Sequence, residues 1–220
     1  MNYKDNLNPK NNVILAFCCM ISTYGFMMIV QFYCDYLYMQ YNNEKVNDIF
    51  ANFLNYIDSN KYITTICNPD YTLYLCIFVY LYNINKLDNR FKIMTKTCIL
   101  LSMSFILRMI TISSTIMPPS NKKCTAFYYD FKNLDIDILY YAILRMFNFI
   151  NTCTDKIYSG HISVATIFLL SWNKYIIKYN HILILLLILM SIGTIINRNH
   201  YTVDVTVSII INYLLFKNFN

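Results

Sequence analysis

The chain has 220 residues, of which 57% are apolar and only 14% are charged, well below the charged fraction of about 25% in ordinary soluble domains. Its net charge of +6 comes from basic residues spread singly between apolar runs, which does not favour a nucleic-acid surface. Three glycines and four prolines provide few turns for a β-barrel, and the eight cysteines show no metal-binding spacing. The composition therefore predicts an all-α membrane protein.

Six apolar segments approach the length of about 20 residues that a helix needs to cross a bilayer. The first is longer than the apolar core of a secretory signal and lacks a small-residue cleavage site, so we expect it to be retained. Pro69 and Asp70 trim the start of the second segment, and the last three segments are short. The predicted spans cover residues 13–33, 67–84, 98–117, 161–177, 182–196 and 201–216. Together they predict a six-helix membrane bundle in which residues 1–220 form one domain.

Two further apolar segments are predicted to lie at the membrane interface or to pack on the bundle. Residues 46–57 place Ile49, Phe53 and Ile57 at helical spacing, which is typical of an amphipathic surface helix. Residues 136–150 are apolar but short and contain a charged arginine, so a span is the less favoured alternative there.

The distribution of basic residues predicts the orientation of the spans. With both termini in the cytosol, the cytosolic segments hold nine lysines and arginines against Asp5 and Asp88, whereas residues 34–66 hold four acidic residues against two lysines. This asymmetry follows the positive-inside rule. Because His161 begins the fourth span and His200 closes the fifth, both histidines are expected on one membrane face, lumenal or extracellular.

Polar residues at the ends of the spans suggest chemistry. In "HYTVD", His200 and Asp204 lie four residues apart, so they share one face of a helix. A carboxylate beside an imidazole fixes its tautomer and raises its basicity, as nucleophilic catalysis requires. In "YSGH", Ser159 and Gly160 precede His161 at a helix start, where backbone N–H groups favour a phosphate. The plainer alternatives are a structural His–Asp pair and an N-capping serine.

Arg108 lies inside the third predicted span, where a lone arginine normally faces a polar cavity or a partner. Its planar guanidinium suits a phosphate, and a structural ion pair, for instance with Asp204, is the alternative. The two histidines, the aspartate and the arginine together indicate phosphoryl transfer. A zinc site is less favoured because no HExxH motif is present, and a serine hydrolase is less favoured because Ser159 has no GxSxG context.

At this point the motifs resemble those of the sphingomyelin synthase family, a branch of the lipid phosphate phosphatase superfamily. "SGH" at 159–161 is followed about forty residues later by "HYTVDV", and "CTDKIYSGH" is similar to the family's Cys-Gly-Asp-x-x-x-Ser-Gly-His block, keeping Cys153 and Asp155. Residues 107–124 look like the block that begins with an arginine and ends with a cysteine. The resemblance runs from the third span to the C-terminus and agrees with six spans.

The chain also departs from the family pattern. Thr154 stands where the family has glycine, Ile162 stands where it has threonine, and "CNPDYT" is a poor match to its proline-rich block. These departures leave the head group open. The phosphatase branch's Lys-x6-Arg-Pro motif is absent, and Thr194 occupies the place of its arginine before the HxxxD histidine. Both absences favour the transferase branch.

The resemblance implies a mechanism without metal or cofactor. His200 would attack the phosphorus with Asp204 orienting it, and His161 would act as the acid and then the base. The resemblance also assigns substrate binding to a further set of residues, namely Arg108, Asp155, Ser159, Gly160, Arg198 and Tyr201.

The implied reaction moves a phospho-head group to ceramide and releases diacylglycerol. Phosphatidylcholine is the expected donor, with phosphatidylethanolamine or phosphatidylinositol as alternatives. A lipid phosphate phosphatase that uses water, and a non-catalytic lipid-binding or scaffold protein, remain as competing hypotheses. The expected location is the Golgi, endoplasmic reticulum or plasma membrane. The sequence allows a homo-oligomer, and Cys124 and Cys153 lie on the lumenal side, where they could form a disulfide.

Overall fold

A computed structural model describes residues 9–41, 68–115, 140, 143–144, 157–176, 180–197 and 199–219. Within these ranges the regular secondary structure consists of helices and includes no strand, which confirms the predicted all-α class. Each predicted span coincides with one long helix. The six helices are α1 (Pro9–Tyr41), α5 (Pro69–Ile84), α6 (Arg90–Ser114), α8 (Gly160–Tyr175), α9 (Asn180–Ile196) and α10 (Thr202–Phe219).

Local signals fix where the site-bearing helices begin. Asn68 caps α5, because its side chain accepts the Asp70 backbone N–H at 2.9 Å, and Pro69 follows in the first turn. Ser159 caps α8 in the same way through the Ile162 backbone N–H. The proline and aspartate that shortened the second predicted span are therefore the start signals of its helix.

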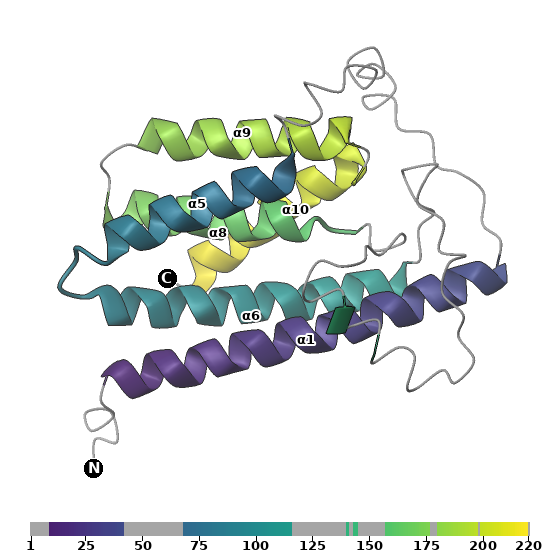
Figure 1. The fold of residues 1–220 in the computed structure, drawn as a ribbon, viewed down its shortest axis with the longest axis horizontal. Coiled ribbons are helices and arrows are strands. Elements are labelled where there is room, and N and C mark those ends of the chain that lie inside the picture. The colour runs from purple at the N-terminus through teal and green to yellow at the C-terminus, as the bar shows by residue number, and fades with distance from the viewer. Residues whose placement is uncertain are drawn as a thin grey trace.

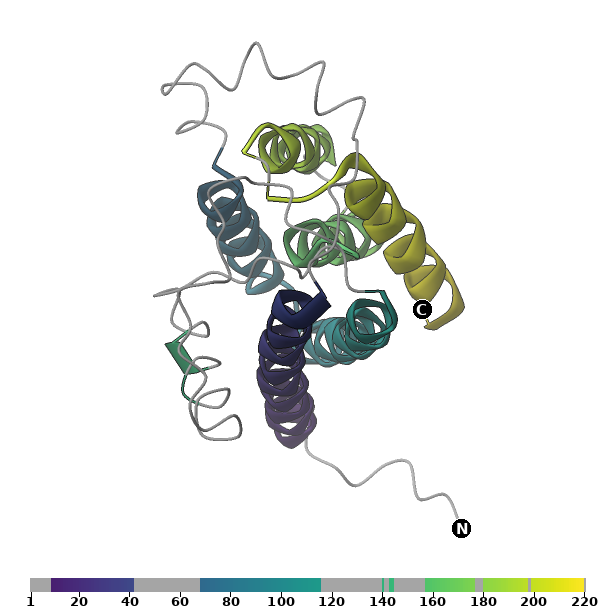
Figure 2. The same ribbon diagram turned by 90° about the vertical axis from the view of Figure 1, so that its right-hand side faces the viewer.

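Helix α8 lies at the centre of the bundle. It packs against α5, α6, α9 and α10, while α1 lies along the outer side of α6. Figure 2, turned towards the helix ends, shows this arrangement. The core includes the fully buried Trp172 and the stacked rings of Tyr80 and Phe168, whose centroids are 4.4 Å apart.

The bundle exposes large apolar side chains on its outside and buries small polar ones together with its apolar core. Large apolar side chains are exposed along the outer faces, among them Phe26 on α1, Phe78 on α5 and Leu185 on α9. Small polar side chains such as Ser163 and Ser208 are buried between helices. Exposed apolar surface of this extent marks contact with lipid or partners, and small polar residues are typical of helix contacts within membranes.

Among the described residues, two helical stretches are long and apolar enough to cross a membrane, Pro9–Leu37 and Arg90–Ser114, and Ile184–Ile196 is a shorter apolar helix. These stretches suggest membrane association. The six-span topology and its orientation stay predictions. The predicted helix at 46–57 and the residues Cys124 and Cys153 lie outside the described residues. Of the segment 136–150 only 140, 143 and 144 are described, and these are helical.

Candidate active site

His200 and Asp204 form a buried pair at the start of α10. The His200 Nδ1 atom lies 3.3 Å from Asp204 Oδ2, and the two side chains are only 5% and 0% exposed. An ionised carboxylate can only accept hydrogen bonds, so Nδ1 carries the proton in this contact. The tautomer fixed in this way directs the lone pair of the other ring nitrogen, Nε2, away from the aspartate.

The backbone at the start of α10 holds Asp204 in place. Its Oδ2 also accepts the Tyr201 backbone N–H at 2.9 Å, so the carboxylate caps the helix that carries it. The other carboxylate oxygen, Oδ1, is buried and has no hydrogen-bond partner among the described residues. A buried polar atom in this state is costly unless a ligand or water meets it.

The segment before α8 meets the start of α10. The Ser159 backbone N–H donates to the Asp204 carbonyl at 3.4 Å, and the Ser208 hydroxyl donates to the Ser159 carbonyl at 3.0 Å. The SGH and HYTVD motifs therefore lie together at one end of the bundle. The Ser159 side chain accepts the Ile162 N–H at 3.5 Å, which agrees with a capping role.

His161 is paired with a residue that the sequence analysis did not assign to the site. Its Nε2 atom lies 2.7 Å from Oδ1 of Asp70, in the first turn of α5. The two side chains are 21% and 50% exposed, so this pair is partly exposed, whereas the His200–Asp204 pair is buried. The signal in the sequence was "NPD", a capped helix start with an acidic first turn. Only the packing of α5 on α8 shows which histidine it serves.

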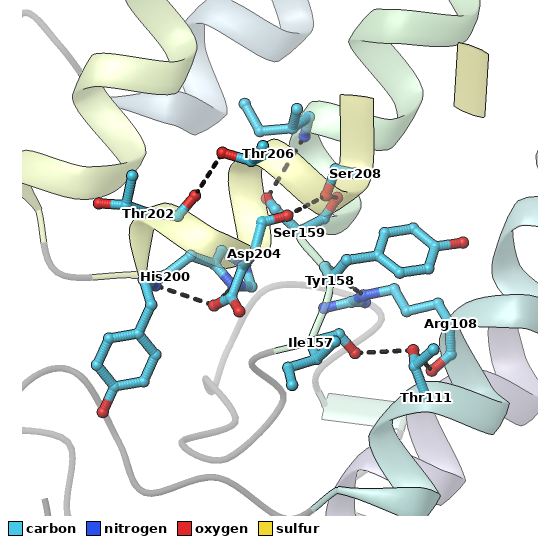
Figure 3. Close-up of polar contacts among 12 residues, drawn as sticks. Arg108, Thr111, Ile157, Tyr158, Ser159, His200, Thr202, Asp204, Thr206 and Ser208 are labelled. Atoms are coloured by element: carbon cyan, nitrogen blue, oxygen red, sulfur yellow. Dashed lines mark hydrogen bonds and ion pairs between the residues drawn. The ribbon is translucent and has the colours of Figure 1, made fainter. Parts of the chain in front are cut away.

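Arg108 is buried in α6 and holds the segment before the SGH motif. Its Nε donates to the Tyr158 carbonyl at 2.6 Å, and its Nη1 lies 3.4 Å from the Met27 sulfur on α1. The neighbouring Thr111 hydroxyl donates to the Ile157 carbonyl at 2.9 Å. Figure 3 shows Arg108 and Asp204 on opposite sides of residues 157–159. Arg108 thus links α1, α6 and the α8 start.

Gly160 lets the Arg108 guanidinium approach the start of α8 closely. A Cβ atom at this position would lie 3.1 Å from Arg108 Nη1 and 3.3 Å from its Cζ, closer than ordinary van der Waals contact. The glycine of the SGH motif is therefore explained by close packing against Arg108.

Tyr158 completes the attachment of this segment to α6. Its phenol is fully buried and donates to the Ser104 carbonyl. Burial raises the pKa of the Tyr158 phenol, so the group stays neutral and keeps its donor.

The remaining predicted site residues are placed less fully. Tyr201 is buried and contributes its backbone N–H to Asp204. Asp155 and Arg198 lie outside the described residues. Within the described part of the chain, no three His, Cys, Asp or Glu side chains gather as a metal site would require.

Residues 152–220 match the family model for the C-terminal region of the PAP2 superfamily. The matched region contains both the SGH and the HYTVD motifs. No curated protein matches the chain. The family match supports the lipid phosphate phosphatase superfamily, whose members are phosphatases and phosphotransferases of lipid phosphates, and so supports an enzyme.

Proposed function

We propose that this protein is a membrane-embedded phosphotransferase of the sphingomyelin synthase type, moving a phospho-head group from a glycerophospholipid to ceramide. The observation that carries the proposal is the buried His200–Asp204 pair joined through the backbone to the SGH segment. A water-excluded imidazole with a fixed tautomer is the nucleophile that phosphoryl transfer through a covalent intermediate needs.

In the first half-reaction, the Nε2 lone pair of His200 attacks the phosphorus of the donor. The bond from phosphorus to the diacylglycerol oxygen breaks, and that oxygen takes a proton from His161. The positive charge on the phosphorylated imidazole is offset by Asp204, whose Oδ2 accepts the Nδ1–H. Diacylglycerol leaves, and the head-group phosphate stays on His200.

In the second half-reaction, His161 takes the proton of the ceramide primary hydroxyl. The hydroxyl oxygen attacks phosphorus, the phosphorus–nitrogen bond breaks, and His200 is restored. One imidazole can serve both steps because histidine gives up and regains a proton near neutral pH.

Asp70 and Arg108 assist the two histidines without being the nucleophile or the acid–base group. Because Asp70 accepts the Nε2–H of His161, the proton exchanged with substrate is carried on Nδ1 of that ring. The Arg108 Nε donates to the Tyr158 carbonyl, and by the resemblance its planar guanidinium charge would stabilise the phosphate.

Hydrolysis of a lipid phosphate, with water in place of ceramide, is the second candidate. The buried Thr194 bears on the choice between them. It stands where the phosphatase branch has an arginine, and its hydroxyl donates to the Met190 carbonyl of its own helix at 2.6 Å. A threonine bonded in this way supplies no charge to a phosphate, which favours the transferase.

A multi-pass integral membrane location belongs to the same proposal. The apolar outer faces of α5, α9 and α10 support insertion of these shorter helices beside α1 and α6. The site then lies at the interface, on the lumenal or extracellular face, where lipid head groups reside.

The test is transfer of a head group to fluorescent ceramide in membranes that contain the protein. Phosphatidylcholine, phosphatidylethanolamine and phosphatidylinositol are offered separately as donors, and phosphate release from phosphatidic acid is followed in parallel. We expect a head-group-bearing product that is lost in His200→Ala but kept in His181→Ala, a matched control whose histidine is exposed at the start of α9. Phosphate release alone would identify the phosphatase, and neither product would refute both enzymes.

A further inference from the structure

An apolar groove lies between α9 and α10, with α8 at its base. Leu187 of α9 lines one side, Ile209 and Leu214 of α10 line the other, and Leu169 and Leu170 line it from α8. The volume of the groove is about 300 Å³, at the lower end of the range of about 300–1,000 Å³ that is usual for ligand pockets. A groove of this size suits one narrow ligand.

The lining of the groove offers a ligand apolar surface. Thr166 is the most polar side chain at its base, but this side chain is buried and its hydroxyl donates to the Ile162 carbonyl of its own helix at 2.7 Å. Tyr213 also lines the groove and is half-exposed. A hydrocarbon chain gains free energy on such a surface, whereas a polar head group would lose its hydrogen bonds there.

The groove exists because α9 and α10 diverge. Each of these helices packs against α8, but within the described residues they make little contact with each other. Residues 197–201 join Ile196, the end of α9, to Thr202, the start of α10. Figure 1 shows the two helices spreading apart from this connection. The connection carries His200, so the groove lies between two helices that meet at the proposed nucleophile.

The groove lies at the depth of an acyl chain below the site. Along α10, Ile209 and Leu214 follow Asp204 by about 7.5 and 15 Å, at a rise of about 1.5 Å per residue. Half of the hydrocarbon core of a bilayer is also about 15 Å thick. With the site at the interface, the groove therefore covers the depth that the acyl chains of one leaflet occupy.

We infer that the groove between α9 and α10 holds a fatty-acyl chain of the phospholipid donor while its phosphorus is at His200. This inference rests on the proposed function, because it requires a donor at that histidine. The donor is the lipid that His200 attacks, so its chains extend from the α9–α10 connection into the membrane. Ceramide instead meets His161, whose partner Asp70 belongs to α5. Leu187 and Leu214 then determine which donor chain lengths the protein accepts.

The experiment fills the groove with an indole and compares donors of two chain lengths. Leu187→Trp fills it from α9. Leu185→Trp is the matched control, because Leu185 is 55% exposed and lies two positions away, about 200° around the same helix. Leu214→Trp fills the groove from α10, where the half-exposed side chain leaves room for a larger one.

The measurement is kcat/KM for transfer to fluorescent ceramide by the purified full-length protein in detergent micelles. Dipalmitoyl-phosphatidylcholine and dihexanoyl-phosphatidylcholine are the two donors, and melting temperature is measured on the same preparations. The ratio of kcat/KM for the long donor to that for the short donor should fall about tenfold in Leu187→Trp and in Leu214→Trp. A fall of this size corresponds to about two methylene groups kept out of the groove. Leu185→Trp should keep the ratio of the unmodified protein.

An unchanged ratio in Leu214→Trp, in a folded protein with turnover, overturns the inference and leaves the proposed function standing. An equal fall in Leu185→Trp also overturns it, because the groove is then ordinary lipid-facing surface. If the variants discriminate between long and short ceramides but not between donors, the groove holds ceramide and the inference is wrong. If the unmodified protein turns over neither donor and none with another head group, the proposed function fails and the inference fails with it.

Discussion

Replacing Asp70 by asparagine separates the role of the α5 carboxylate from the packing of the helix. The variant keeps an oxygen that can accept the His161 Nε2–H but removes the negative charge 2.7 Å away. His161 should therefore stay near its position while the protonated form of its ring loses its partner. We expect a loss of turnover with little loss of stability.

The exposure of the pair sets the size of both effects. The side chains are 21% and 50% exposed, so solvent screens the charge and the stability change should be about 0–1 kcal/mol. A charge-assisted hydrogen bond is worth about 1.5–3 kcal/mol. After discounting for exposure, about 1.4 kcal/mol of transition-state stabilisation remains, which is a tenfold fall in kcat/KM.

The assay is initial-rate turnover of the lipid substrate, with melting temperature measured on the same preparations. Asp88→Asn is the matched control, because Asp88 is an exposed aspartate in the turn between α5 and α6, away from the site. Asp88→Asn should match the unmodified protein in both measurements. Unchanged kcat/KM in Asp70→Asn, in a protein whose turnover requires His161, would refute the positioning role of Asp70.

Three further substitutions test the packing around the site. Gly160→Ala should lower turnover in the lipid assay by about tenfold or more, because the new Cβ displaces the Arg108 guanidinium. The higher helix propensity of alanine should meanwhile favour α8 itself. Equal turnover would show that the guanidinium can shift without loss of activity. Arg108→Lys should lower the free energy of unfolding by about 1–3 kcal/mol, since the buried Tyr158 carbonyl loses its Nε donor, and thermal melting checks this. Asp204→Asn should reduce kcat at least about a hundredfold while the protein stays folded, because the neutral amide can no longer offset the positive charge of the phosphorylated His200 ring. Full activity would exclude the pair from catalysis.

Much of the fold could be predicted because each helix carries its own signal. Apolar runs marked all six helices, although the last three runs are short, and Ser159 and Asp204 stand at the starts of α8 and α10 as helix termini require. The His200–Asp204 contact could also be predicted, since the two residues are only four positions apart, although His200 lies just before α10 and not on a face of that helix as predicted.

The parts of the site that the sequence did not predict depend on contacts between distant parts of the chain. Asp70 lies 91 residues before His161, and nothing local to either motif pairs them. The phosphate role of Arg108 stays a prediction, whereas the contact of its Nε with the Tyr158 carbonyl is a backbone contact that no side-chain pattern encodes.

Trapping the covalent intermediate tests the central claim most directly. The purified protein is mixed with a phospholipid that carries radiolabelled phosphate, quenched in alkali, and examined for label on the chain. We predict acid-labile, alkali-stable label on the unmodified protein and on His181→Ala, and none on His200→Ala. Label of equal amount on His200→Ala, or turnover by the unmodified protein without any trapped label, would contradict a phosphohistidine at His200.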